Sequence, residues 1–112
     1  MHTIREMLGN DENVWVYLKN EDTRKEFARM AAAEGFHFGE LPFEKWAFGY
    51  VVAVHNNGDM GHLPLFIWCS SFAADSDSCP RKVDFSLYLN DQDDHCCYTS
   101  HFRSFRSIGN AI

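Results

Sequence analysis

The sequence has no acidic residue after Asp94, although it contains 16 acidic residues in all. Residues 1–94 carry eight Lys and Arg against those 16 Asp and Glu, a net charge of −8, whereas the last 18 residues carry +2. The overall charge of −6 lacks the basic excess that general binding to DNA or RNA requires. We therefore expect neither double-stranded nucleic acid nor an anionic membrane as a partner.

Long apolar segments are also missing. Met1 to Gly9 lacks the apolar stretch of a signal peptide. The longest apolar run, Leu63 to Cys69, contains Pro64 and falls far short of the roughly 20 residues that span a bilayer. We therefore expect a cytosolic protein with reduced cysteines, which are Cys69, Cys79, Cys96 and Cys97.

The composition favours one folded domain over residues 1–112. An apolar fraction of 46% and an aromatic fraction of 15% argue against disorder, and the length suits a single small core. Ten Phe, four Tyr and three Trp are many for this size. Because aromatic residues are enriched at interfaces, we expect some of them to lie at one.

A strand followed by a helix is predicted near the amino terminus. Residues 13–19 alternate between two faces and are rich in strand-forming side chains. Asn20 is a suitable N-cap for a helix that runs to about Glu34, and Gly35 is a natural stop. Before this strand, residues 3–8 form one or two helical turns.

Mostly strands and turns are predicted after this helix. The turn signal Asn56-Asn57-Gly58-Asp59 favours a hairpin, and Pro64 demotes part of the return strand to an edge or bulge. Strand 83–89 has a helical turn as its alternative. The expected strands are 36–38, 45–55, 60–70, 83–89 and 98–108, the last as a strand or an extended arm, with a polar loop at 73–80 and a turn at 90–94.

This order predicts an α+β fold in which one main helix packs on a mostly antiparallel sheet. Residues 91–112 add a C-terminal strand or arm to the single domain. One helix covers only one sheet face, so the face that carries Trp15 and Tyr17 needs another cover. We take this as an argument for a homo-oligomer.

No metal, cofactor or catalytic group is predicted. A zinc site at the His and Cys residues of 95–101 is disfavoured, because adjacent cysteines point apart in a strand; a half-buried strand with one Cys in the core is favoured. The acidic groups at 75–77 and 91–94 lack the Gly and closing Glu of a calcium loop. No local signature supports a Cys nucleophile with a His base. The zinc candidates are His95, Cys96, Cys97 and His101, and the acidic groups are Asp75, Asp77, Asp91, Asp93 and Asp94.

Aromatic and basic residues gather toward the carboxyl end. An aromatic ring stacks on a flat base, and a guanidinium holds phosphate or stacks as well. The alternative is that the Phe residues lie in the core while the arginines pair with Asp91–Asp94. The predicted ligand-binding residues are Phe72, Arg81, Lys82, Tyr88, Asn90, Phe102, Arg103, Phe105 and Arg106.

Several segments resemble small proteins from phages and mobile elements of gut bacteria. Those with the resemblance are Val14-Trp-Val-Tyr-Leu-Lys-Asn20, Thr23-Arg-Lys-Glu-Phe27, Ala33-Glu-Gly-Phe36-His-Phe-Gly39, Tyr50-Val-Val-Ala-Val-His55, Met60-Gly-His62 and Val83-Asp-Phe-Ser-Leu-Tyr88. Among characterised phage proteins of this size, the chain resembles the Thoeris anti-defence sponges most.

The resemblance implies an α+β homo-oligomer in the cytoplasm of a bacterial host cell. Such a protein sequesters cyclic ADP-ribose isomers or cyclic oligonucleotides without cleaving them, through aromatic and Arg stacking. Two other functions stay open. One is an acidic protein–protein inhibitor of a nuclease, similar to an anti-CRISPR, and the other is a small nucleotide hydrolase.

Overall fold

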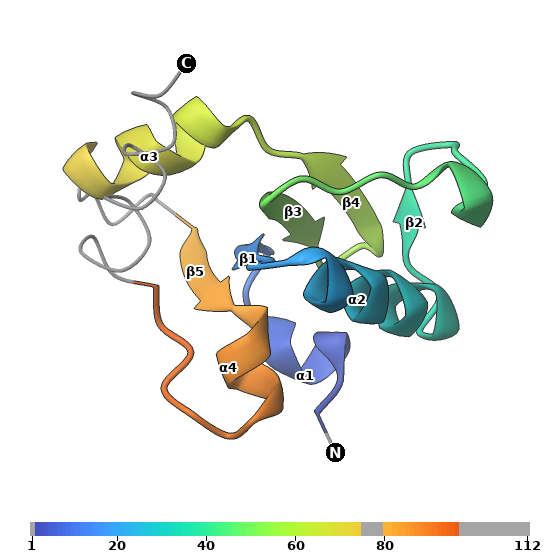
Figure 1. The fold of residues 1–112 in the computed structure, drawn as a ribbon, viewed down its shortest axis with the longest axis horizontal. Coiled ribbons are helices and arrows are strands. Elements are labelled where there is room, and N and C mark those ends of the chain that lie inside the picture. Colours follow the sequence, from blue (N-terminus) through green and yellow to red (C-terminus); the bar gives the residue numbers. More distant parts are fainter. Residues whose placement is uncertain (1, 75–79, 97–112) are drawn as a thin grey trace.

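The computed structural model describes residues 2–74 and 80–96, and a five-stranded sheet lies at its centre (Figure 1). The strand order is β2-β4-β3-β1-β5. β3 pairs antiparallel with β1 and β4, whereas β1–β5 and β2–β4 are parallel. The α+β class is therefore confirmed, with a mixed sheet. The strands are β1 (Asn13–Tyr17), β2 (His37–Phe38), β3 (Val51–His55), β4 (Asp59–His62) and β5 (Arg81–Asp84).

Helices accompany the sheet in more than one place. The 13-residue α2 and the ten-residue α3 are the longest in the described part, so a fold with one main helix is not what the structure shows. A short 3-10 helix, η1, spans Phe43–Lys45. The α-helices are α1 (Ile4–Leu8), α2 (Glu21–Ala33), α3 (Leu65–Ala74) and α4 (Phe85–Leu89).

The boundaries of α2 agree with the sequence prediction. The Asn20 side chain accepts a hydrogen bond from the Thr23 N–H at 2.8 Å, which satisfies one donor of the first turn. Gly35 follows the helix with a φ of 85°, a conformation that glycine adopts without a steric penalty. Phe27 and Ala31 form the buried side of the helix.

The predicted strand over 60–70 is wrong beyond β4. Pro64 has no N–H for a strand ladder, and its carbonyl instead accepts from the N–H of Ile67 and of Trp68, at 3.0 and 3.3 Å. These bonds form the first turn of α3, so the chain passes from strand to helix at the proline. α3 then continues to Ala74, inside the segment expected as a loop.

Two other strand predictions are too long. β5 ends at Asp84, whose side chain accepts from the Leu87 N–H at 3.3 Å and caps α4, so the helical alternative holds over 85–89. The strand expected from Lys45 begins only at Val51. The short strand at 37–38 and the hairpin turn before Asp59 are confirmed, with Gly58 at a φ of 97°.

Helices from different parts of the chain cover the two faces of β1. Val14 and Val16 face the core that contains Phe27 of α2. On the opposite face, Trp68 of α3 is fully buried and stacks on Tyr17, with ring centroids 6.2 Å apart and planes inclined by 24°. The face that the sequence left uncovered is therefore covered from within the chain.

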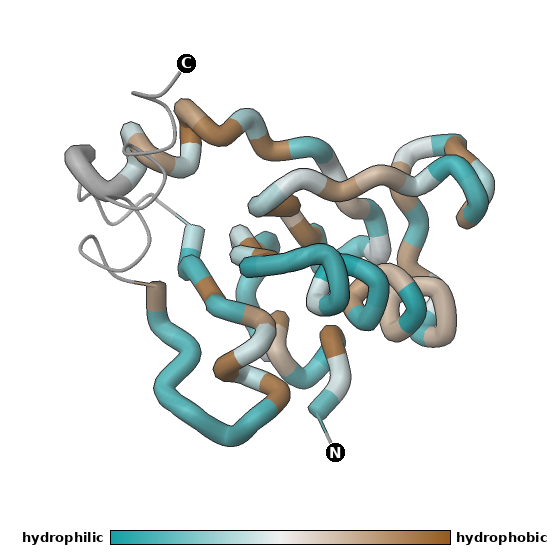
Figure 2. Tube along the Cα trace, in the orientation of Figure 1, coloured by the Kyte–Doolittle hydropathy of each residue, from teal (hydrophilic) through white to brown (hydrophobic). Residues whose placement is uncertain are grey.

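The two long helices differ in character. Hydrophobic residues run through the described part of α3, whereas much of α2 is hydrophilic (Figure 2). No described helix is both long and apolar enough to cross a membrane.

Replacing Trp68 with Ala tests the cover that α3 provides. We expect a loss of about 3–5 kcal/mol in the free energy of unfolding, because the indole is fully buried. The matched control is Phe66→Ala on the same helix, whose side chain is 70% exposed and whose loss stays below about 0.5 kcal/mol. Urea unfolding followed by circular dichroism measures both, and equal losses would contradict this packing.

Candidate functional site

The structure places only part of the predicted ligand-binding set. The zinc candidates Cys97 and His101 and the acidic pair Asp75 and Asp77 lie outside the described residues. Of the predicted ligand-binding residues, the side chain of Phe72 and the whole of Phe102, Arg103, Phe105 and Arg106 also lie outside them.

Arg81 connects β5 to the amino-terminal segment. Its Nε donates to Asp11 Oδ2 at 3.0 Å, and its Nη2 donates to the Met7 carbonyl. Successive residues of a strand point to opposite faces, so Arg81 and Lys82 lie on opposite faces of the sheet. The structure therefore separates two residues that the sequence placed in one site.

Tyr88 and Asn90 both hydrogen-bond to backbone carbonyls. The Tyr88 hydroxyl donates to the Thr3 carbonyl at 2.6 Å. Burial raises the pKa of Tyr88, and the nearby Glu6 carboxylate raises it further. Asn90 Nδ2 donates to the Ser86 carbonyl at 2.8 Å at the end of α4. Both side chains thus hold the local fold in this structure.

Lys82 lies beside an aromatic ring. Its Nζ is 5.6 Å from the centroid of Trp15, which is its neighbour across the parallel β1–β5 pair. Both side chains are half-buried. A cation at this distance is attracted to the face of the indole.

A second cation–aromatic pair lies at the same end of the sheet as Tyr17. The Arg24 guanidinium is 5.4 Å from the centroid of Tyr50, and its Nη1 donates to the Leu18 carbonyl at 3.3 Å. Leu18 N–H in turn donates to the Tyr50 carbonyl at 2.7 Å, which joins β1 to the start of β3. We name this group the aromatic–cation edge: Trp15, Tyr17, Arg24, Tyr50 and Lys82.

The parallel pairing brings these groups together. The carboxyl ends of β1 and β5 meet at one edge, where Tyr17 lies opposite Asp84. Burial raises the pKa of the Tyr17 phenol, and the charge of Asp84 raises it further, while Arg24 lowers it. Asp84 is only 5% exposed and caps α4. The phenol therefore stays neutral at physiological pH.

Most of this edge was missed by sequence reasoning, which singled out Lys82 alone. The alternation of β1 did place Trp15 and Tyr17 on one face. The pairing of β1 with β5 was not predicted, because no local signal connects residue 15 to residue 82. Arg24 gave no signal beyond its place in the first turns of a helix.

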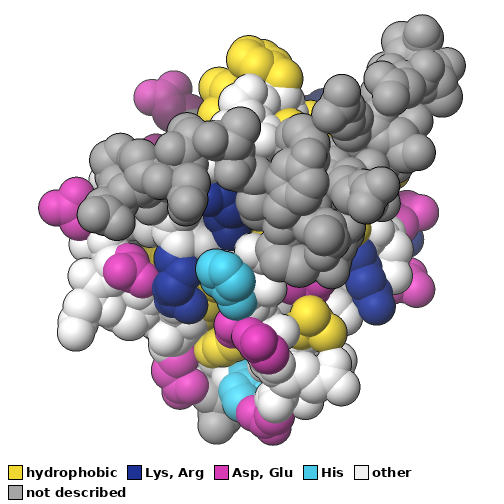
Figure 3. Space-filling model, turned by 90° about the vertical axis from the view of Figure 1, so that its left-hand side faces the viewer, with side chains coloured by type: hydrophobic (Ala, Val, Ile, Leu, Met, Phe, Trp, Pro, Cys, Tyr) yellow, Lys and Arg dark blue, Asp and Glu magenta, His cyan; other side chains and the backbone are white. Residues whose placement is uncertain are grey.

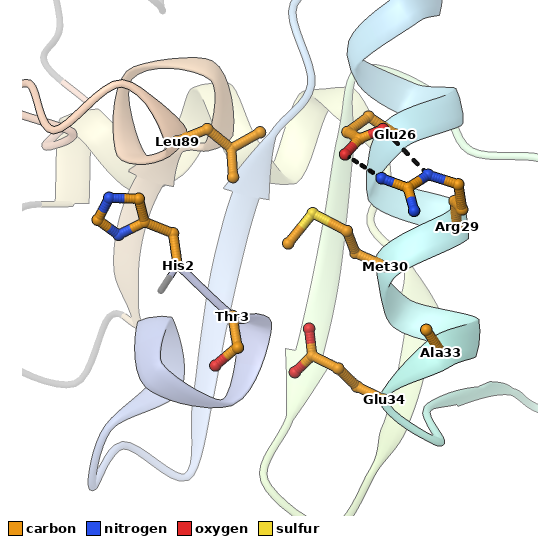
Figure 4. A pocket seen from close by; sticks show the side chains of 8 residues that line it. All are labelled: His2, Thr3, Glu26, Arg29, Met30, Ala33, Glu34 and Leu89. Atoms are coloured by element: carbon orange, nitrogen blue, oxygen red, sulfur yellow. Dashed lines mark hydrogen bonds and ion pairs between the residues drawn. The ribbon is translucent and has the colours of Figure 1, made fainter.

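A groove of about 370 Å³ lies elsewhere, between α1, α2 and α4 (Figure 4). Met30 from α2 and Leu89 from α4 point toward each other across it. Its full lining is His2, Thr3, Glu26, Arg29, Met30, Ala33, Glu34 and Leu89.

The charged groups of this groove pair with groups of the protein itself. Glu34 accepts from the N–H of Ile4 at 2.9 Å and from the N–H of Arg5 at 3.0 Å. Arg29 Nε donates to Glu26 Oε2 at 3.2 Å, and His2 Nε2 lies 2.6 Å from Asp91 Oδ1. These bonds make the groove the seam that attaches the amino-terminal segment.

Charges of both signs share the side of the molecule that faces left in Figure 1 (Figure 3). Acidic, basic and histidine side chains lie next to one another there. Within residues 2–74 and 80–96, no three His, Cys, Asp or Glu side chains gather as a metal site. Cys96 is 2% exposed and packs in the cluster that contains Trp68.

Comparisons with known proteins give no match. No family model, no curated protein and no solved structure matches this chain. The resemblance to the Thoeris anti-defence sponges therefore stays a prediction.

Replacing Glu34 with Ala tests whether the groove is a structural seam. We expect a loss of about 1–3 kcal/mol in unfolding free energy, because two amide N–H groups of α1 lose their acceptor. Glu26→Ala is the matched control in the same groove. Its pair with Arg29 is largely exposed, so its loss stays below about 1 kcal/mol. Equal effects in urea unfolding would contradict this role.

Alkaline pH tests the environment of Tyr17. The folded state holds the phenolic proton more tightly than the unfolded state, whose tyrosines ionise near about pH 10. Stability from this group is therefore complete below that pH and falls as the pH rises through the higher folded value. We expect Tyr17→Phe to flatten the fall in melting temperature above about pH 10. An unchanged slope would refute the assignment.

Proposed function

We propose that this protein binds a planar, anionic, nucleotide-derived ligand and holds it without changing it chemically. The observation that carries the proposal is the aromatic–cation edge, where two cations and three aromatic side chains meet. Trp15 and Lys82 come from paired strands, and Arg24 and Tyr50 come from the segments that follow β1 and precede β3.

The chemistry of this edge suits such a ligand. A base stacked on an aromatic ring contributes about 1–3 kcal/mol, and Lys82 and Arg24 supply positive charge for phosphates. Ligands of open α/β sheets commonly bind beyond the carboxyl ends of the strands, which is where β1 and β5 end together. In an acidic chain, local cations also favour an anion at this place over the rest of the surface.

Binding without turnover is the form of the proposal that the nearby groups support. The Tyr17 phenol stays protonated, and the Asp84 carboxylate accepts from the Leu87 N–H as a helix cap. The sequence resemblance gives the narrower version: a phage counter-defence protein that sequesters cyclic ADP-ribose isomers or cyclic oligonucleotides. An acidic inhibitor of a nuclease is less well supported, because acidic and basic groups are interspersed on the side shown in Figure 3.

Isothermal titration with cyclic ADP-ribose isomers and cyclic dinucleotides tests the proposal. We expect saturable heat with at least one of them, and about tenfold or greater weakening in Lys82→Met, which keeps the length of the side chain without its charge. The control is Lys45→Met, whose side chain is exposed in η1, away from the edge. Circular dichroism confirms that both variants fold.

Three results would count against the proposal. If none of these ligands binds, there is no nucleotide site of this class. Equal weakening by Lys82→Met and Lys45→Met would place the ligand away from the aromatic–cation edge. Mass spectrometry of the bound ligand after incubation separates holding from hydrolysis, because a sponge returns it intact.

A further inference from the structure

The outward side of α3 exposes large apolar side chains. Phe66 is 70% exposed, more than any other described large hydrophobic residue, and the adjacent Ile67 is 37% exposed. The inward side is anchored by Trp68, which is fully buried, and by Ser71, whose hydroxyl donates to the Trp68 carbonyl at 2.6 Å. α3 therefore packs on the sheet through one side and presents an apolar opposite side.

The charge of the chain indicates what such a surface contacts. Residues 65–74 contain no charged side chain, whereas α2 carries acidic and basic residues along its length. A protein with a net charge of −6 repels its own copies, and this repulsion is weakest where two charge-free surfaces meet. A basic partner would instead be drawn to acidic surface, which α3 does not offer. A second copy of the chain is thus the occupant that fits.

The shape of the exposed side supports the same occupant. Phe66 and Ser70 are four residues apart and lie on one side of the helix, and both are exposed. One is large and the other is small. In a two-fold contact, residue i of one copy meets residue j of the other, and j meets i. An antiparallel pair of α3 helices therefore joins large to small twice.

We propose that two copies of this protein associate through an antiparallel, two-fold contact between their α3 helices. Phe66 of each copy packs over the partner's Ser70, with Ile67 beside the contact. This inference does not depend on the proposed ligand. A ten-residue helix is only about 15 Å long, so the contact is smaller than a standard interface of about 1,200–2,000 Å². The dimer is accordingly a weak one that forms at high protein concentration.

Sedimentation velocity of the full chain tests the contact. Between about 5 and about 500 μM, mass action shifts the wild-type protein from monomer toward dimer. Phe66→Ser stays monomeric over this range. Phe43→Ser is the matched control, because Phe43 is 50% exposed in η1, and it associates as the wild type does.

A large-for-small exchange distinguishes this geometry from general stickiness. Ser70→Phe sets two rings against each other and weakens association about tenfold or more, although it makes the helix more apolar. The double variant Phe66→Ser with Ser70→Phe restores association, because large again meets small across the two-fold axis. All changed side chains are exposed, and circular dichroism confirms their folding.

Several outcomes would overturn the proposal. A wild-type protein that stays monomeric at every concentration would mean that another segment or another protein covers α3. Stronger association of Ser70→Phe would indicate non-specific hydrophobic contact. Loss of association in Phe43→Ser would place the interface at η1, and failure of the double variant to recover would exclude the antiparallel register.

Discussion

β1 is a five-residue strand on which both halves of the core depend. It pairs with β3 on one side and with β5 on the other, and its alternate side chains enter different clusters. Val14 and Val16 join the core beneath α2, while Tyr17 on the other face stacks with Trp68 of α3. A slip of one residue in β1 would exchange these two sets and place aromatic rings where α2 needs compact side chains. The register of this strand therefore fixes the core and the aromatic–cation edge together.

Local signals in the sequence were sufficient for the first third of the fold. The cap at Asn20, the glycine after α2 and the alternation of β1 each act within a few residues, so a reader of the sequence can find them. The segment after Pro64 shows where this fails. Its apolar residues suit a buried strand or a buried helix equally well, and the choice depends on Trp68 meeting a sheet face formed by distant residues.

The candidate site was harder to predict than the fold, for a related reason. Lys82 was identified from its charge, yet its neighbour Trp15 is 67 positions earlier, and only the parallel pairing of β1 with β5 joins them. Arg81 looked equivalent to Lys82 in the sequence, but strand alternation sends it to the opposite face, where it bonds to Asp11. Composition showed which residue types were present, and long-range pairing decided which of them meet.

The attachment of α1 has a consequence for the order in which the chain folds. Five residues are too few for a helix to persist alone in water, and α1 relies on acceptors and donors from much later segments. Glu34 supplies acceptors for its first turn, and Tyr88 donates to the Thr3 carbonyl. During synthesis on the ribosome, the helix made first therefore has to wait until about residue 88 has emerged. Such distant contacts delay the rate-limiting step of folding, and they make the amino terminus one of the last parts to be secured.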